Sequence, residues 1–510
     1  MNSKLKTQNY YITTTLPYVN AKPHIGFALE IIQADVLARY HALRGDEVIF
    51  NTGTDEHGVK IYRKAEEEGK EVQAYCDEYA SKFDELKTLL NLSYDSFIRT
   101  TDEHHVKATQ EFWKRCNKNG DIYKKNYQTK YCTGCELEKT DSELENDKCP
   151  VHPNLVLELI NEENYFFKFS NYTDKLLDFY KKNSDFVVPA HRQNEIKKFV
   201  ERGLQDFSIS RLKSKMPWGV PVPEDEEHVM YVWFDALVNY ISTLGWPGDE
   251  KNFEAFWPGV QVAGKDNLRQ QTAMWQAMLM SAGLPNSKQV FIHGFITSDG
   301  QKMSKSLGNV IDPVDVVGKY GTDAVRYFLL GGISSFEDGD FTIEKLEKFY
   351  TAHLANGVGN FTSRVLTMLE KYSNNVVPEK NNKSQDYRLQ TTDFWEQYFL
   401  SMEKYNFEEG VRIVNDFVGV LDGIISEQKP WEKTKAGEDI SGLLYQLAEG
   451  LRHIGLALLP IIPDSAEKIL NSLGVENVKD LILDEEKECG RLAVGTKVKK
   501  GEMLFPRLEK

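Results

Sequence analysis

The alternation of apolar and polar residues predicts a strand, a helix and a second strand at the start of the chain. Residues 10–16 form a β-branched and aromatic run that is typical of a buried strand. Residues 24–45 then place apolar side chains at helical spacing, and residues 47–53 form a second strand. This order indicates the βαβ unit of a parallel sheet. Ligands of such sheets bind in loops that follow the strands, which here are residues 15–24 and 52–58.

The pattern changes twice further along the chain. From about residue 123 to 229, short aromatic runs, a Cys/His stretch and a basic helical segment interrupt it. The α/β pattern returns at residues 228–242 and continues to about 340, after which helical patterns dominate. We therefore expect an α/β domain in two halves, 1–122 and 230–345, that is split by an insertion at 123–229 and followed by a helical domain at 346–510.

Composition indicates a globular protein of several domains, because 510 residues exceed the size of one compact domain. No apolar run approaches the roughly 20 residues that a bilayer span needs, and the first residues lack the apolar core of a signal peptide. Three scattered cysteines give no disulfide framework. We therefore expect a cytoplasmic protein without membrane contact. The net charge of −15 argues against a surface coated for nucleic acid, but it averages over faces that can differ.

Two short motifs have the residue types that bind phosphate. His24, Gly26 and Phe27 lie where a loop turns into a helix, and a helix N-terminus favours phosphate. Taken alone, His24 is more simply explained as a helix-start residue without chemistry. The segment 302–306, KMSKS, follows a predicted strand and carries two lysines among hydroxyl residues, which suits the phosphates of ATP. Alone, it would be interpreted as a solvated loop.

Together, in this order, the two motifs resemble the HIGH and KMSKS motifs of class I aminoacyl-tRNA synthetases, and the pair is highly specific. The resemblance implies that an amino-acid carboxylate attacks the α-phosphate of ATP and that His24, Lys302 and Lys305 stabilise the developing charge. Phe27 departs from the family, which most often has a second histidine there. Mg²⁺ would accompany ATP. The residues implied in ATP binding are His24, Gly26, Phe27, Glu30, Gly264, Asp266, Lys302, Ser304 and Lys305.

The chain resembles the methionyl-tRNA synthetase family over essentially its whole length. Apolar and aromatic walls with one donor suit a thioether, although plain core packing explains the same aromatics without the resemblance. By the resemblance, Asp55 faces the substrate ammonium, and Gln271 replaces a histidine of the family's pocket. The residues implied in binding L-methionine are Leu16, Tyr18, Asp55, Trp233, Ala236, Leu237, Tyr240 and Gln271.

Four residues in the insertion have the spacing of a zinc site: Cys132, Cys135, Cys149 and His152. Three thiolates and an imidazole in paired knuckles suit one tetrahedral, structural Zn²⁺. The position matches the family's connective insertion in its single-knuckle form. A rival set, His57, His104 and His105, is expected to be solvated or hydrogen-bonded.

Several residues are candidates for tRNA contact. Residues 181–215 hold nine Lys/Arg against four Asp/Glu, and Arg211 resembles a family residue near the acceptor end, although a solvated basic face explains the charge equally well. Asn360, Arg364 and Trp431 match the family's anticodon-reading positions, and an indole after a proline can stack on a base.

The resemblance thus implies a Rossmann-type parallel-sheet catalytic domain split by a zinc-knuckle insertion, with an α-helical anticodon-binding domain. The implied activity is methionine–tRNA ligation to initiator and elongator tRNA(Met) by a monomer. The alternatives are another class I enzyme, of the cysteine type, and a catalytically idle paralogue that binds tRNA.

Overall fold

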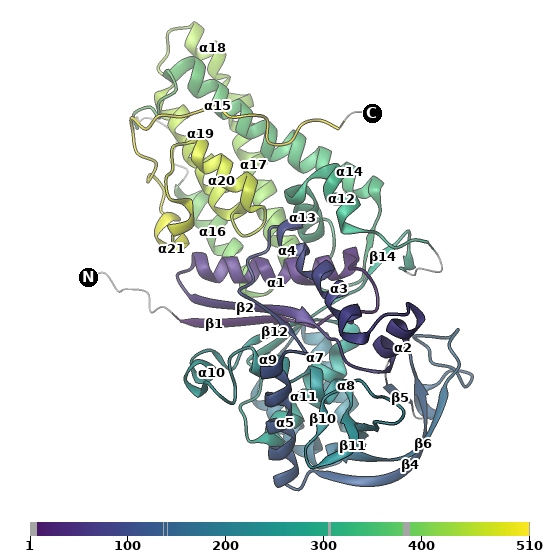
Figure 1. Cartoon of the computed structure of the whole chain (residues 1–510). Coiled ribbons are helices and arrows are strands. Elements are labelled where there is room, and N and C mark those ends of the chain that lie inside the picture. Colours follow the sequence, from purple (N-terminus) through teal and green to yellow (C-terminus); the bar gives the residue numbers. More distant parts are fainter. Residues whose placement is uncertain (1–7, 136, 140, 304–307, 381–387, 509–510) are drawn as a thin grey trace.

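A computed structural model of the chain describes residues 8–508 except 136, 140, 304–307 and 381–387. Its centre is a six-stranded parallel sheet in the order β3-β2-β1-β12-β13-β7 (Figure 1). The predicted strand–helix–strand unit is confirmed as the first two strands and helix α1 (Ile25–Leu43). The strands of this sheet are β1 (Asn9–Thr14), β2 (Glu47–Thr54), β3 (Ser96–Arg99), β7 (Val187–Val188), β12 (Val260–Gly264) and β13 (Gln289–His293).

Successive side chains of a β-strand point to opposite faces of the sheet, so each strand contributes to two hydrophobic cores, one on each face. Tyr10 and Ile12 of β1 belong to the core on the α1 side, whereas Tyr11 belongs to the core on the opposite side. The sheet is therefore buried on both faces, which explains why its strands appear in the sequence as continuous apolar runs. The helices of this α/β part are α2 (Val59–Glu67), α3 (Val72–Asp84), α4 (Leu86–Leu89), α5 (Glu103–Lys118), α8 (Val232–Ala236), α9 (Asn239–Ser242), α10 (Glu250–Phe256), α11 (Trp275–Ala282), α12 (Pro313–Tyr320) and α13 (Thr322–Gly331).

The predicted insertion forms small antiparallel sheets, but it also contributes a strand to the main sheet. β7 pairs in parallel with β13 at the edge of the main sheet. The helices of the insertion are α6 (Thr173–Lys182) and α7 (Ala190–Glu201). Its other strands are β4 (Ile122–Cys132), β5 (Leu137–Lys139), β6 (Glu158–Phe167), β8 (Phe207–Ser208), β9 (Ser210–Leu212), β10 (Pro221–Val222) and β11 (Asp225–Met230), while β14 (Ile296–Ser298), β15 (Gln301–Lys302) and β16 (Gly339–Phe341) form a further sheet near the lysine motif.

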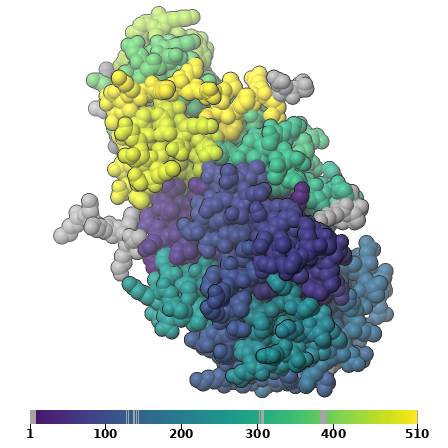
Figure 2. Space-filling view, viewed as in Figure 1, coloured from purple at the N-terminus to yellow at the C-terminus, as the bar shows by residue number. Residues whose placement is uncertain are grey.

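The last third of the described chain is helical and packs on the α1 side of the sheet (Figure 1). In the space-filling view, the purple N-terminal residues lie between this yellow and green helical part and the teal and blue residues below (Figure 2). None of the helices in the described ranges is long and apolar enough to cross a bilayer. The helices here are α14 (Ile343–Phe349), η6 (Tyr350–Val358), α15 (Gly359–Ser373), α16 (Arg388–Glu403), α17 (Phe407–Gln428), α18 (Pro430–Lys435), α19 (Ser441–Leu458), α20 (Pro463–Ser472) and α21 (Leu483–Glu486).

Candidate active site and metal site

A cavity of about 730 Å³ opens where the central strands end. The loops after β1, β2, β12 and β13 all contribute to its wall, as expected for a parallel α/β sheet. Fourteen of the residues predicted to bind ATP or methionine line it together. They are Leu16, Tyr18, His24, Gly26, Phe27, Glu30, Asp55, Trp233, Ala236, Leu237, Tyr240, Gly264, Asp266 and Gln271.

The N-terminus of α1 faces this cavity. His24 is the N-cap in extended conformation, and its Nδ1 accepts a hydrogen bond from the backbone N–H of Gly26 at 3.1 Å. A Cβ on Gly26 would lie only 2.9 Å from the His24 ring, so a larger residue here would displace this ring. Phe27 packs edge-on against Phe83 with ring centroids 5.5 Å apart, so it adds an apolar wall where the family most often has a histidine.

One residue of the lysine motif, Met303, lies beside the N-terminus of α1: its Cε would be 3.5 Å from a Cβ on Gly26. Met303 lines the cavity, and the N–H of Ile25 donates to the carbonyl of Ile311 at 3.0 Å, which joins the segment after the motif to α1. Ser304 and Lys305 lie outside the described residues, as does the side chain of Lys302. Their roles remain predictions.

Two loops form the part of the wall that is predicted to hold the amino acid. The N–H of Asp55 donates to the carbonyl of Pro17 at 3.0 Å, and the N–H of Val19 donates to the carbonyl of Asp55 at 3.2 Å. These backbone bonds fix Tyr18 beside Asp55. On the other wall, Gln271 Nε2 donates to Tyr240 Oη at 2.7 Å, so the amide that replaces the family's histidine still bonds to the tyrosine.

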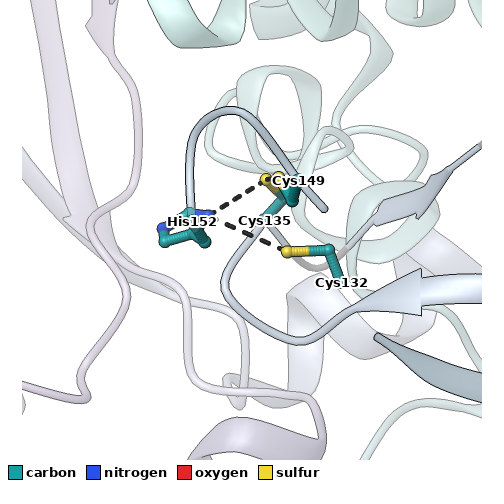
Figure 3. Close-up of side chains that lie close together, drawn as sticks. All are labelled: Cys132, Cys135, Cys149 and His152. Atoms are coloured by element: carbon teal, nitrogen blue, oxygen red, sulfur yellow. Dashed lines mark hydrogen bonds between the residues drawn. The ribbon is translucent and has the colours of Figure 1, made fainter. Parts of the chain in front are cut away.

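The four predicted metal ligands lie together between β4 and β6, and their ligand atoms are all within 4.8 Å of one another (Figure 3). Cys135 Sγ is 3.2 Å from His152 Nδ1 and 3.5 Å from Cys149 Sγ. Zn–S and Zn–N bonds of about 2.3 and 2.0 Å place tetrahedral ligands at similar separations, so the set fits Zn²⁺. A Cβ on Gly134 would lie 2.5 Å from the His152 ring, so a larger residue at this position would displace this predicted ligand.

A second group of possible ligands, Glu449, His453 and Cys489, does not suit a cation. The Glu449 carboxylate already accepts hydrogen bonds from Arg452 and from the backbone N–H groups of residues 490–492. A metal ion there would be repelled by the guanidinium.

The chain matches known proteins over almost its whole length. The family model described as "tRNA synthetases class I (M)" matches residues 10–154 and 138–366. The methionine–tRNA ligase of Thermosynechococcus vestitus is 41% identical over 98% of each chain, and that of Thermotoga maritima is 40% identical over 98% of this chain and 80% of its own. This chain belongs to the class I methionyl-tRNA synthetase family. A solved structure of Mycobacterium tuberculosis methionyl-tRNA synthetase with methionyl-adenylate has a TM-score of 0.93 and 35% identity, covering 98% of this chain and 100% of its own.

Sequence reasoning missed His293, which ends β13 and lines the cavity of this methionyl-tRNA synthetase family member. Its Nε2 lies 3.0 Å from Glu30 Oε2, and its Nδ1 lies 2.7 Å from the carbonyl of Gly294. Burial alone would lower the pKa of His293, but Glu30 reverses this and raises it. Glu30 also accepts from the Thr15 N–H at 2.9 Å. The available signal was the position of His293 at the end of the strand that precedes the lysine motif.

The histidines of the rival set are solvated or hydrogen-bonded, as predicted. His57 Nδ1 lies 2.6 Å from Asp235 Oδ2, and His105 Nε2 lies 2.9 Å from Asp235 Oδ1. The side chains of His57, His105 and Asp235 are buried, whereas His104 is exposed. The three buried groups form a hydrogen-bonded bridge behind the cavity wall.

The residues predicted to contact tRNA lie outside the cavity, in two separate places. Arg211 is 6% exposed; its guanidinium stacks on Tyr231 and donates to Ser208 Oγ at 2.7 Å. A contact with tRNA would require this side chain to leave its site. On the helical domain, Asn360 is exposed, Arg364 donates to Asp422, and Trp431 is 39% exposed at the start of α18.

Proposed function

We propose that the chain is a methionine–tRNA ligase, which forms methionyl-adenylate and pyrophosphate from L-methionine and ATP and then transfers methionine to the 3′ end of tRNA(Met). One observation carries the proposal. A single cavity, in a chain that matches methionine–tRNA ligases over its whole length, is lined both by the N-terminus of α1 and by the predicted methionine pocket.

The chemistry requires positioning and charge stabilisation, because no protein nucleophile takes part. His24 and Gly26 at the N-terminus of α1 would bind the phosphates of ATP, with Lys302 and Lys305 completing the site from the KMSKS loop. Asp55 would hold the ammonium of methionine, while Trp233, Ala236 and Leu237 would pack against its side chain. Mg²⁺ would neutralise phosphate charge.

The metal site has a structural role in this proposal. Cys132, Cys135, Cys149 and His152 would hold one Zn²⁺, and four protein ligands leave no position for water. Cys135 and His152 also line the cavity, so an ordered knuckle would shape one wall of the active site.

Recognition of tRNA would use the helical domain. Asn360 and Arg364 are four residues apart on α15 and share a face, and Trp431 is half exposed and available for stacking on a base. The tRNA partners would be initiator and elongator tRNA(Met), and the protein would act as a monomer with the domain boundaries given above. These local contacts do not conflict with a net charge of −15.

Amino-acid-dependent ATP–pyrophosphate exchange across the standard amino acids tests the proposal. Methionine alone should support exchange; signal with cysteine alone would indicate the cysteine-type enzyme, and no signal with any amino acid would indicate the idle paralogue. Lys305→Ala should lower exchange by orders of magnitude and leave the far-UV circular dichroism unchanged. The matched control is Lys479→Ala, at an exposed position of η7 (Val478–Asp480), which should retain full exchange.

A further inference from the structure

A row of buried amide and hydroxyl groups, joined by hydrogen bonds and called the relay below, runs from the interior of the protein to the cavity. Its members are all less than 5% exposed, and none is charged. In order, they are Gln276, Ser287, Gln261, Gln271 and Tyr240.

Backbone groups fix the direction of this relay at its inner end. The N–H of Ser287 donates to Gln276 Oε1 at 3.1 Å, and Gln276 Nε2 donates to the carbonyl of Gln271 at 2.8 Å. A backbone N–H can only donate and a carbonyl can only accept, so the amide of Gln276 has one possible orientation.

The remaining orientations follow from that one. Gln276 Nε2 also donates to Ser287 Oγ at 3.0 Å, so the hydroxyl of Ser287 is free to donate to Gln261 Oε1 at 2.6 Å. Gln261 Nε2 must then face Gln271 Oε1, at 3.2 Å. Each group donates to one neighbour and accepts from the other, so the orientation of Gln276 determines the orientation of every following group.

The relay ends on Tyr240, whose Oη accepts from Gln271 Nε2 at 2.7 Å. The side chain of Asn239 also bonds to this hydroxyl, in the sense that lowers the pKa of Tyr240, as a donor does and an acceptor does not. Among the described residues no acceptor is therefore paired with the hydroxyl proton, and Tyr240 lines the cavity. Burial raises the pKa of Tyr240, so the group keeps its proton at neutral pH. The hydroxyl proton is therefore available to a ligand in the cavity.

We propose that Gln261 and Ser287 are positioning residues that orient the Tyr240 hydroxyl as a donor into the amino-acid pocket, where it distinguishes a thioether sulfur from a methylene. The inference rests on the proposed function and adds specificity-determining residues that do not touch the substrate. When the relay is broken, Gln271 can turn its carbonyl to the hydroxyl. A carbonyl oxygen is a stronger acceptor than a thioether sulfur, so the proton would then leave the pocket.

The test compares methionine with norleucine, in which a methylene replaces the sulfur. The readout is the ratio of kcat/KM for the two amino acids in pyrophosphate exchange. Gln261→Met, which keeps the volume but has no amide, should lower the ratio by about tenfold, the value of one neutral hydrogen bond. Ser287→Ala should lower it in the same direction, and Ser287→Thr, which keeps the hydroxyl, should restore it.

Tyr240→Phe removes the hydroxyl itself and should therefore show the full loss of the methionine-to-norleucine ratio of kcat/KM. Its ratio should equal that of the double variant Gln261→Met/Tyr240→Phe, because the relay acts only through the hydroxyl. A parallel loss of kcat/KM for both amino acids, with the ratio unchanged in Gln261→Met and Ser287→Ala, would overturn the inference and leave these residues a structural role. Absence of methionine-dependent exchange in the unaltered protein would instead refute the proposed function.

Discussion

Asp235 connects two parts of the cavity wall that are predicted to bind methionine, and its replacement by asparagine tests how much that connection stabilises the fold. The carboxylate is fully buried on α8, between Trp233 and Ala236 of the cavity wall. One oxygen binds His57, two residues after Asp55, and the other binds His105 of α5. Asparagine keeps the shape but offers an acceptor to only one of the two imidazole N–H groups.

The expected loss follows from the ionisation of this carboxyl group. Burial alone would raise its pKa, but the two histidines outweigh burial and lower the pKa of Asp235 to about 2. Compared with an ordinary aspartate, that pKa corresponds to roughly 2 to 3 kcal/mol of folding free energy at neutral pH. Because an imidazole N–H left without an acceptor adds to this loss, we expect Asp235→Asn to lower the free energy of unfolding by about 3 kcal/mol.

Urea unfolding followed by tryptophan fluorescence measures this loss, since Trp218 lies against His57 with ring centroids 5.6 Å apart. The pKa of the carboxyl group is depressed in the folded state, so its contribution is complete above the ordinary pKa and is lost as pH falls through the folded-state value. The difference in unfolding free energy between the two proteins should therefore be complete above about pH 5, narrow below about pH 4 and close near pH 2.

Asp393→Asn, at an exposed position on α16, is the matched control and should change the stability by less than about 0.5 kcal/mol. A loss below about 1 kcal/mol for Asp235→Asn, or a gap that widens as pH falls, would show that the carboxylate does not act as an ionised bridge.

Three further predictions concern other parts of the chain. Metal analysis of freshly purified protein should give one zinc per chain, and Cys149→Ser should abolish it; a zinc-free native protein would contradict the site. Trp431→Ala should lower the rate of tRNA charging by at least about tenfold, the contribution of one stacked base, and spare pyrophosphate exchange, whereas equal loss in both assays would exclude a tRNA-specific role. Glu449→Gln should lower the free energy of unfolding by about 2 to 3 kcal/mol, because Arg452 and the N–H groups of 490–492 lose a charged acceptor, and it should leave the KM for methionine unchanged.

The spacing of apolar residues was sufficient to predict those strands and helices whose ends are marked by proline, glycine or a capping residue. The first strand, the helix that begins after His24 and the second strand lie where the pattern predicts them. The strand β7 could not be predicted, because it consists of Val187 and Val188 alone and is defined by its pairing with β13. The sequence also could not tell that Arg211 is buried, since its exposure depends on Tyr231, which covers it from the N-cap position of α8.

The cavity residues were predictable to the extent that they belong to motifs with fixed spacing. The relay behind Tyr240 was not, because Gln261, Gln271 and Ser287 come from a strand, a helical turn and a loop, and only their hydrogen bonds connect them. His293 was missed for the same reason: its partner Glu30 is 263 residues away in the sequence. Contacts between residues so far apart in the sequence depend on the topology of the fold. The local pattern of apolar and polar residues does not reveal that topology.

Arg326 shows why the predicted boundary near residue 345 is not a mechanical hinge. Its guanidinium is fully buried and donates to Asp35 of α1 at 2.7 Å, and also to the carbonyls of Pro460 and Ile461 of the helical domain at 3.1 and 2.8 Å. Separating the two parts would deprive the guanidinium of both carbonyl acceptors, at a cost of about 1.5 to 3 kcal/mol for each hydrogen bond to this charged group. These bonds hold residues 460–461 to α1, whose N-terminus faces the cavity, so a movement of the helical part relative to α1 would first have to break them.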